Sequence, residues 1–175
     1  MKKYRIILIP QMDAWEEFYK ITESLSEISD GYLMSSNSSV PHITLSKFEA
    51  EDKAVEKIWN SCRMTVVPNV EFYGLTFAKR KVNWALVLTK RTEIVPFQKK
   101  VYEILNTHNL KLDEIIRESY IPHLTLIRTP LSELEIIKKL GDFSFLFEKK
   151  LKWNLVIARS GKYGKIKEKD TVYST

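Results

Sequence analysis

Cysteine, glycine and proline are scarce in this sequence of 175 residues. The single cysteine, Cys62, excludes an intramolecular disulfide framework and is compatible with a reducing cytosol. We expect its side chain to be buried or half-buried at the end of a helix. No stretch rich in proline, glycine and serine forms a linker. The chain is therefore predicted to be a single domain, residues 1–175, made of two interlocked lobes.

Long hydrophobic runs are also missing. The apolar run 6–9 is too short for the core of a signal peptide and stops at Pro10, although Met1-Lys2-Lys3 resembles the charged start of one. No stretch approaches the roughly 20 apolar residues that a membrane-spanning helix needs. We therefore expect a cytoplasmic protein with no membrane partner, and we expect a monomer.

What is present is an ordinary apolar fraction with an excess of positive charge. The chain has 44% hydrophobic and 29% charged residues, with 28 Lys and Arg against 22 Asp and Glu, giving a formal net charge of +6. Such an excess favours an anionic partner, with RNA or a nucleotide as the natural candidate. A basic surface that only keeps the protein dissolved explains the charge equally well.

Hydrophobic patterns along the chain predict an alternation of strands and helices. Strands are expected at 4–9, 42–47, 64–67, 70–78, 82–89, 143–147, 151–158 and 166–173. Helices are expected at 13–28, 51–62 and 93–108, and between Ser132 and Gly141, where Glu135 completes a capping box. The predicted fold is α+β: a two-lobed, pseudo-symmetric duplication with mainly antiparallel sheets lining a central cleft and helices packed outside.

The repeat behind this prediction is a pair of hexapeptides, Val40–Leu45 and Ile121–Leu126. Both read apolar-Pro-His-apolar-Thr-Leu, in a chain with only three histidines. On a strand, residues two apart point the same way, so each segment presents one imidazole beside one hydroxyl while the intervening apolar residues face a core. The proline fits the first residue of a strand, where a missing N–H is tolerated.

Two imidazoles and two hydroxyls facing one cleft can perform acid–base chemistry at phosphorus. The ordinary pKa of an imidazole is about 6.5, so at neutral pH one ring can be a free base while the other is protonated. One can then remove a proton from an attacking hydroxyl while the other protonates the leaving oxygen. The Thr hydroxyls can donate to the phosphoryl oxygens held between the two rings. This arrangement requires neither a metal nor a cofactor.

At these residues the chain resembles the two-histidine (2H) phosphoesterase superfamily, which includes bacterial 2′–5′ RNA ligase-like proteins and cyclic phosphodiesterases. The shared pattern is His42-Ile43-Thr44-Leu45 with His123-Leu124-Thr125-Leu126, 81 residues apart. The strands expected near 5–9, 84–88 and 155–160 look like the flanking elements of the family. The resemblance implies that His42 and His123 are the general acid and base, and that Thr44 and Thr125 contact phosphate.

It further implies a metal-independent hydrolase with RNA ends, oligonucleotides or cyclic nucleotides as substrates. The reaction is opening of a 2′,3′-cyclic phosphate, or hydrolysis or ligation of a 2′–5′ phosphodiester. Degradation of a 2′–5′ oligonucleotide signal uses the same chemistry. We expect both imidazoles to be exposed in the cleft, so that their replacement leaves the fold intact.

Two alternatives remain at this level. The first is a non-catalytic RNA- or nucleotide-binding protein that retains the cleft. The second is a metal site formed by His42, His108 and His123, although no His-x-x-x-His spacing supports it. We place His108 at a helix C-terminus and outside the site. We interpret the basic tip 79–81 and the basic tail from Lys162 as solvated, and Trp84 as a core residue. For Tyr163 the sequence does not decide whether the ring stacks on a base.

Overall fold

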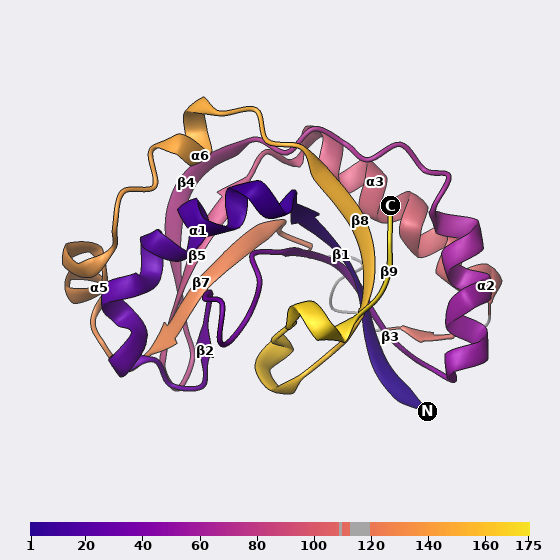
Figure 1. Ribbon diagram of the computed structural model, residues 1–175, viewed down its shortest axis with the longest axis horizontal. Coiled ribbons are helices and arrows are strands. Elements are labelled where there is room, and N and C mark those ends of the chain that lie inside the picture. Colours follow the sequence, from indigo (N-terminus) through magenta and orange to yellow (C-terminus); the bar gives the residue numbers. More distant parts are fainter. Residues whose placement is uncertain (109, 113–119) are drawn as a thin grey trace.

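The computed structural model describes residues 1–108, 110–112 and 120–175, which form a curved antiparallel sheet with helices outside it (Figure 1). Its strands are β1 (Lys2–Pro10), β2 (Tyr32–Leu33), β3 (Ile43–Ala50), β4 (Phe72–Lys79), β5 (Asn83–Thr89), β6 (Lys111–Leu112), β7 (His123–Thr129), β8 (Trp153–Arg159) and β9 (Thr171–Ser174). Its α-helices are α1 (Trp15–Thr22), α2 (Asp52–Cys62), α3 (Arg91–Thr107), α5 (Glu133–Lys139) and α6 (Phe145–Glu148). Single 3₁₀ turns cover Met12–Ala14, Glu23–Ile28, Lys162–Gly164 and Glu168–Asp170.

The strand order divides the sheet into two halves. The order is β4-β5-β7-β3-β1-β8-β9, with β2 added to β7 and β6 added to β3. Neighbouring strands pair antiparallel throughout the described sheet. Between β7 and β3 the register consists of one pair, Ile43 with Leu124. The halves β4-β5-β7 and β3-β1-β8-β9 of this one sheet are thus joined where the motif strands meet.

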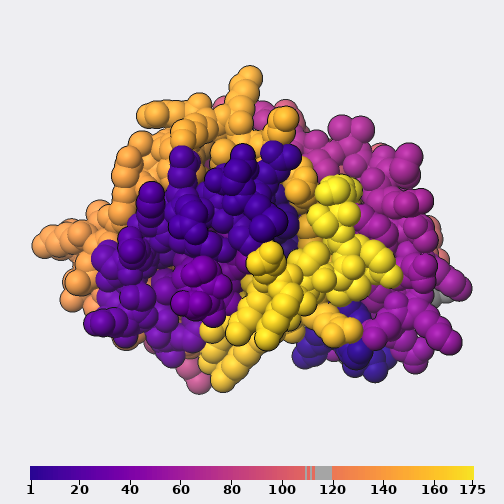
Figure 2. Space-filling view, viewed as in Figure 1, coloured from indigo at the N-terminus to yellow at the C-terminus, as the bar shows by residue number. Residues whose placement is uncertain are grey.

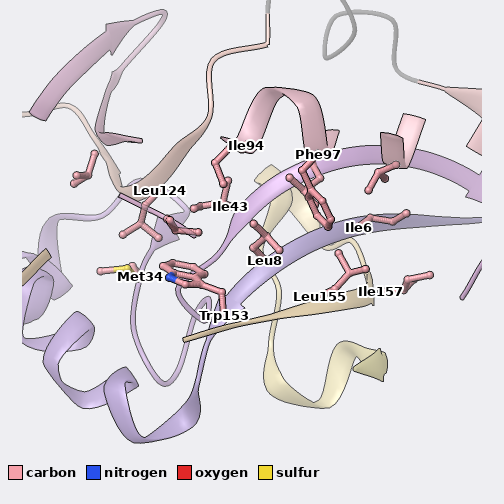
Figure 3. Packing of buried hydrophobic residues seen from close by; sticks show 14 of the residues in the cluster. Ile6, Leu8, Met34, Ile43, Ile94, Phe97, Leu124, Trp153, Leu155 and Ile157 are labelled. Atoms are coloured by element: carbon pink, nitrogen blue, oxygen red, sulfur yellow. The ribbon is translucent and has the colours of Figure 1, made fainter. Parts of the chain in front are cut away.

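Helices cover the outer face of each half. In Figure 1, α1, α5 and α6 lie beside β4, β5 and β7, whereas α2 and α3 lie beside β3 and β1. One continuous core runs between these layers. Figure 3 shows Ile43 and Leu124 side by side within it, with Leu8 of β1 and Ile94 of α3 nearby. The predicted α+β architecture of antiparallel sheets with helices outside is confirmed.

The chain passes repeatedly between the halves. β1 belongs to one half, the following helix α1 to the other, β3 to the first again, and β4 and β5 to the second. The C-terminal segment crosses the face seen in Figure 2, where the yellow residues lie between the indigo N-terminal helices and the magenta of α2. Neither half is therefore built from one continuous stretch of sequence.

The capping box was predicted correctly, but two expected strands are wrong. The Ser132 side chain accepts from the N–H of Glu135, and the Glu135 carboxylate accepts from the N–H of Ser132. Residues 64–67 form no strand, because Met64 and Val66 point into solvent and Pro68 follows. Residues 143–147 do not form a strand either: an Asp142 carboxylate accepts the N–H of Ser144 and starts the short helix α6.

The helix expected over 13–28 is divided. Its α-helical part ends at Thr22 and continues as a 3₁₀ turn over Glu23–Ile28. The cause is a contact from far along the chain, since the N–H of Gly141 takes the carbonyl of Ile21 that a continuing helix would use. Asp13 supplies no side-chain cap to this helix.

The final strand is shorter than expected. Residues 166–170 turn, because the Asp170 carboxylate accepts the N–H of Lys167, and β9 begins only at Thr171. The remaining expected strands and helices shift by at most three residues at their ends. None of the described helices combines the length and apolar character needed to cross a bilayer.

Candidate active site

The two motifs meet at the centre of the sheet. Ile43 and Leu124 are fully buried in the core, so the residues that flank them in each strand point to the opposite, concave face. The Ile43–Leu124 pair thus brings the two motifs together on this face.

All four predicted site residues line one cleft of about 980 Å³. The cleft also takes in residues from β1, from the β4–β5 hairpin and from the loop that follows β8. Its cationic lining residues are Lys3, Arg5, Lys47, Arg80 and Lys162. Against these, Glu49 is the one acidic residue among the described residues of the lining. The cleft is therefore suited to an anionic ligand.

Both imidazoles are held in the same way. The Nδ1 atom of His42 is 2.9 Å from the carbonyl oxygen of Val40, and that of His123 is 2.7 Å from the carbonyl oxygen of Ile121. A carbonyl oxygen can only accept, so each Nδ1 carries the proton and donates it. In the neutral ring, Nε2 then has the lone pair. The proline between each carbonyl and its histidine turns the backbone so that this contact forms within three residues.

The two rings differ in burial. The side chain of His42 is only 5% exposed, whereas that of His123 is half-buried. The expectation that both imidazoles are exposed is therefore wrong for His42: the ring reaches the cleft but is packed on its other sides. Burial lowers the pKa of His42 to about 4, and the charge of Arg5 acts in the same direction.

Burial also lowers the pKa of His123, with Lys47 and Arg5 adding to the effect and the Ile121 carbonyl opposing it. Both imidazoles are thus set up as neutral bases in the unliganded protein. A bound phosphate anion would raise both pKa values again, because an opposite charge nearby favours the imidazolium form.

Thr44 has a cationic partner. Nη1 of Arg5 donates to the Thr44 hydroxyl oxygen over 3.0 Å, and Nε of Arg5 donates to the Ser160 hydroxyl oxygen over 2.8 Å. The hydroxyl of Thr125 makes no hydrogen bond within the described part of the chain, although it lines the same cleft. The two motifs are alike in their histidines and unlike in what supports their threonines.

Three lining residues were not placed in the site by sequence reasoning, which put Trp84 in the core, read Arg80 as solvated and left Tyr163 undecided. Trp84 is half-buried in the cleft wall rather than a core residue, because it faces the concave side of β5. Arg80, at the hairpin tip read as solvated, lines the cleft too. Tyr163 joins them from the loop after β8, with the Arg128 guanidinium 4.5 Å from its ring centroid. The backbone of Tyr163 has a positive φ of 59°, which its sequence neighbours did not predict.

His108 is remote from this arrangement. It closes α3, where its Nε2 atom lies 3.4 Å from the Ser61 hydroxyl oxygen, and it does not line the cleft. A metal site built from all three histidines is therefore not formed. In residues 1–108, 110–112 and 120–175, no group of three or more His, Cys, Asp or Glu side chains is arranged to hold a metal ion.

Comparison with known proteins gives a likeness in structure. A crystal structure of a phosphoesterase superposes with a TM-score of 0.60 over 99% of this chain and 97% of that one, at 9% identity. E. coli LigT complexed with 3′-AMP gives a TM-score of 0.53 at 14% identity, and LigT complexed with NADP⁺ gives 0.54 at 11%. Both LigT matches cover 100% of this chain and 95% of theirs. The chain has the phosphoesterase fold.

The phosphoesterase fold is the one that the resemblance to the 2H superfamily implies, so that expectation is confirmed at the level of fold. No protein-family model matches the sequence, and no curated protein matches it. At these identities the likeness concerns the path of the backbone. The chemistry has to be argued from the residues of the cleft.

Proposed function

We propose that this protein is a metal-independent 2H phosphodiesterase that acts on RNA or nucleotide substrates. His42 and His123 are its general acid and base, and Thr44 and Thr125 bind the phosphoryl oxygens. The reaction is opening of a 2′,3′-cyclic phosphate, or hydrolysis or ligation of a 2′–5′ phosphodiester. The whole chain, residues 1–175, acts as one domain with one motif from each lobe.

One observation carries the proposal: both imidazoles line the same cleft and are oriented by the same backbone contact. With each Nδ1 donating to a carbonyl two residues earlier, each ring has its lone pair on Nε2. A purely structural role for one histidine would not require a second histidine with the same tautomer in the same cleft. Two such rings supply an acceptor and, once one is protonated, a donor on either side of a phosphoryl group.

For a cyclic phosphate the steps follow from these roles. One imidazole takes a proton from water through Nε2 as the water oxygen bonds to phosphorus. The P–O bond to the ribose oxygen breaks, and the other ring, protonated, gives its proton to that oxygen. The phosphate charge raises both imidazole pKa values on binding, so that the second ring can take up the proton that it later gives. The threonine hydroxyls stabilise the charge that develops on the non-bridging oxygens.

Nucleotides are the substrate class that the lining favours. The cleft lining has five cationic side chains and, among the described residues, one acidic side chain. The half-buried ring of Trp84 adds a flat apolar surface to the wall. LigT, which shares the fold, has been crystallised with 3′-AMP and with NADP⁺. These features support a nucleotide or an RNA end as the ligand of this chain.

The test is turnover, in EDTA, of a nucleoside 2′,3′-cyclic phosphate and of a 2′–5′-linked oligoadenylate. We expect one of them to be processed by the wild-type protein, with losses of about 10² or more in His42→Ala and in His123→Ala. His108→Ala is the matched control, since it removes the third histidine outside the cleft. Thermal unfolding of each variant separates lost chemistry from lost fold.

Three outcomes would contradict the proposal. Near wild-type turnover in either motif-histidine variant would remove the assigned roles. Activity that EDTA abolishes and zinc restores would make the enzyme metal-dependent. If neither substrate is turned over and RNA binding weakens steeply with salt, the protein is a non-catalytic binding protein.

A further inference from the structure

We propose that Arg5 is a third phosphate-binding residue of this site, and that the loop Ser160–Gly164 holds its guanidinium in position beside Thr44. The inference rests on the proposed function, because it concerns the same phosphate. It adds a charged group to a site that the motifs alone supply only with imidazoles and hydroxyls.

The strand β1 directs Arg5 into the cleft. Its neighbours Tyr4 and Ile6 are buried in the main core, so Arg5 points to the opposite face of the sheet. Further along that face, Ile7 and Ile9 are covered by a small apolar cluster that includes Val40 and Ile166. Arg5 lies on the same face of β1, beyond the edge of this apolar cluster, where the cleft begins.

The contact with Thr44 determines how that hydroxyl can act. A guanidinium has N–H groups and no acceptor, so the Thr44 oxygen must be the acceptor in the 3.0 Å contact with Nη1. The proton of the Thr44 hydroxyl is then available for a different acceptor. A phosphoryl oxygen in the cleft is such an acceptor, and Arg5 can donate to the same phosphate from beside it, since its planar fork matches phosphate geometry.

The loop after β8 packs directly on the guanidinium. Ser160 accepts from Nε, and a Cβ placed on Gly164 would lie 2.5 Å from Nη2 and 2.7 Å from Cζ and Nη1. Gly164 also has a φ of +80°, so both the space and the backbone favour glycine there. No larger residue could sit at this position without moving Arg5.

The same loop reaches across to the other half of the molecule. The Tyr163 ring lies against Arg128 of β7, 4.5 Å from guanidinium carbon to ring centroid. The ring also covers Gly31, where a Cβ would come within 2.6 Å of it. The loop is therefore held between Arg5, which Ser160 and Gly164 contact, and the other half of the molecule, which Tyr163 contacts.

Electrostatics places the charge of Arg5 near the reacting groups. Its positive charge contributes to the lowered pKa of both His42 and His123. The charged neighbours that act on His42 are Arg5 and His123, and those that act on His123 are Lys47 and Arg5. A cation that acts on both rings lies close to the position of a phosphate held between them. There it would neutralise charge in the transition state.

The experiment measures binding of inorganic phosphate by calorimetry, together with turnover of the cyclic phosphate, in Arg5→Gln and Arg5→Lys. We expect phosphate binding to weaken about tenfold or more in Arg5→Gln, and less in Arg5→Lys, which keeps the charge and loses the fork. Arg159→Gln is the matched control. It removes the same charge from the neighbouring strand, where Arg159 pairs with Asp52 and does not line the cleft.

A second measurement separates a phosphate-binding role from a structural one. In Arg5→Gln the imidazole titrations of His42 and His123, followed by NMR, should both move to higher pH, because a nearby cation has been removed. Ser160→Ala keeps the charge and loses only the Nε contact, so it should weaken phosphate binding while moving the titrations less. If Arg5→Gln fails to fold, Arg5→Lys and Ser160→Ala decide the question.

Equal loss of phosphate binding in Arg5→Gln and Arg159→Gln would overturn the inference, since net charge would then explain the effect. Unchanged binding in Arg5→Gln would overturn it as well. A wild-type protein that binds phosphate through Arg5 but turns over neither substrate would retain the inference and reject the proposed reaction. The two proposals can therefore fail separately.

Discussion

Ile43 and Leu124 lie opposite each other where β3 meets β7, and this one pair joins the two halves of the sheet. Both side chains are fully buried on the core side. Each is flanked in its own strand by the histidine and threonine of its motif, which face the cleft. The apolar contact on one face of the sheet therefore sets the spacing of the polar groups on the other.

Truncating this contact should cost both stability and alignment. Ile43→Ala and Leu124→Ala are each expected to lower the free energy of unfolding by about 2–5 kcal/mol, since the sites are fully buried. Because the residues are paired, the double variant should deviate from additivity by about 0.5–3 kcal/mol. Urea unfolding of the four proteins measures this.

A buried residue of the other half provides the comparison. Ile58 of α2 is also fully buried, and Figure 1 places that helix far from β7. Ile58→Ala combined with Leu124→Ala should be additive within about 0.5 kcal/mol. An equal coupling in both double variants would show that the Ile43–Leu124 contact has no special part in joining the halves.

The burial of His42 predicts a loss of stability in mild acid. Its pKa is about 4 in the folded protein and about 6.5 in an unfolded chain. Above pH 6.5 the ring is neutral in both states and contributes nothing. Between pH 6.5 and 4 only the unfolded chain binds the proton, so the free energy of unfolding falls as the pH falls, by up to about 3 kcal/mol.

His42→Gln should remove this part of the pH dependence, measured as the change in unfolding free energy between pH 7 and pH 4.5. His123 acts in the same direction and leaves a remainder, because its pKa is lowered too. His108→Gln, at the C-terminal end of α3 and outside the cleft lining, serves as the control. A slope unchanged in His42→Gln would contradict the assigned burial of the ring.

The two threonines should respond differently to loss of the hydroxyl. Thr44→Val and Thr125→Val each remove one donor to phosphate, so each should reduce turnover by about 10². Only Thr44→Val also deprives Arg5 of an acceptor, which should cost an additional 1–3 kcal/mol or so of stability. Turnover and thermal unfolding of both variants, with Thr→Ser as the restoring change, test the difference. Equal destabilisation of the two would count against the Arg5–Thr44 contact.

The capping box of α5 offers a change in stability alone. Ser132→Ala removes both its acceptor for the N–H of Glu135 and its contact with the Glu135 carboxylate, at a cost of about 1 kcal/mol. The helix lies outside the cleft lining, so turnover at a temperature well below unfolding should be unchanged. A fall in turnover parallel to that of the motif variants would mean that lost activity in this protein reports lost stability.

Local signals carried most of the sequence-based predictions. The capping box of Ser132 and Glu135 involves residues three apart, and the alternation within each hexapeptide involves residues two apart, so both could be derived without knowing the fold. One wrong assignment arose from a contact between distant segments. The helix after Asp13 was predicted too long because Gly141, more than a hundred residues later, takes the Ile21 carbonyl.

The same distinction applies to the site. Its motif residues could be found from the repeat, and the structure brings all four into one cleft. Trp84 was assigned to the core because an apolar strand gives no sign of which face is covered. Arg5 and Tyr163 gave no local pattern at all, since their partners Thr44, Ser160 and Arg128 lie between 35 and 155 residues away.

From the sequence alone come the strand alternation, the paired histidines and threonines, and the class of chemistry that they can perform. These follow from short-range geometry, because residues two apart on a strand share a face wherever the strand lies. The tertiary structure decided that the motifs meet at Ile43 and Leu124, that His42 is buried, and that Arg5 lies beside Thr44. Those relationships depend on strand order and on packing across the sheet, which no single segment of the chain encodes.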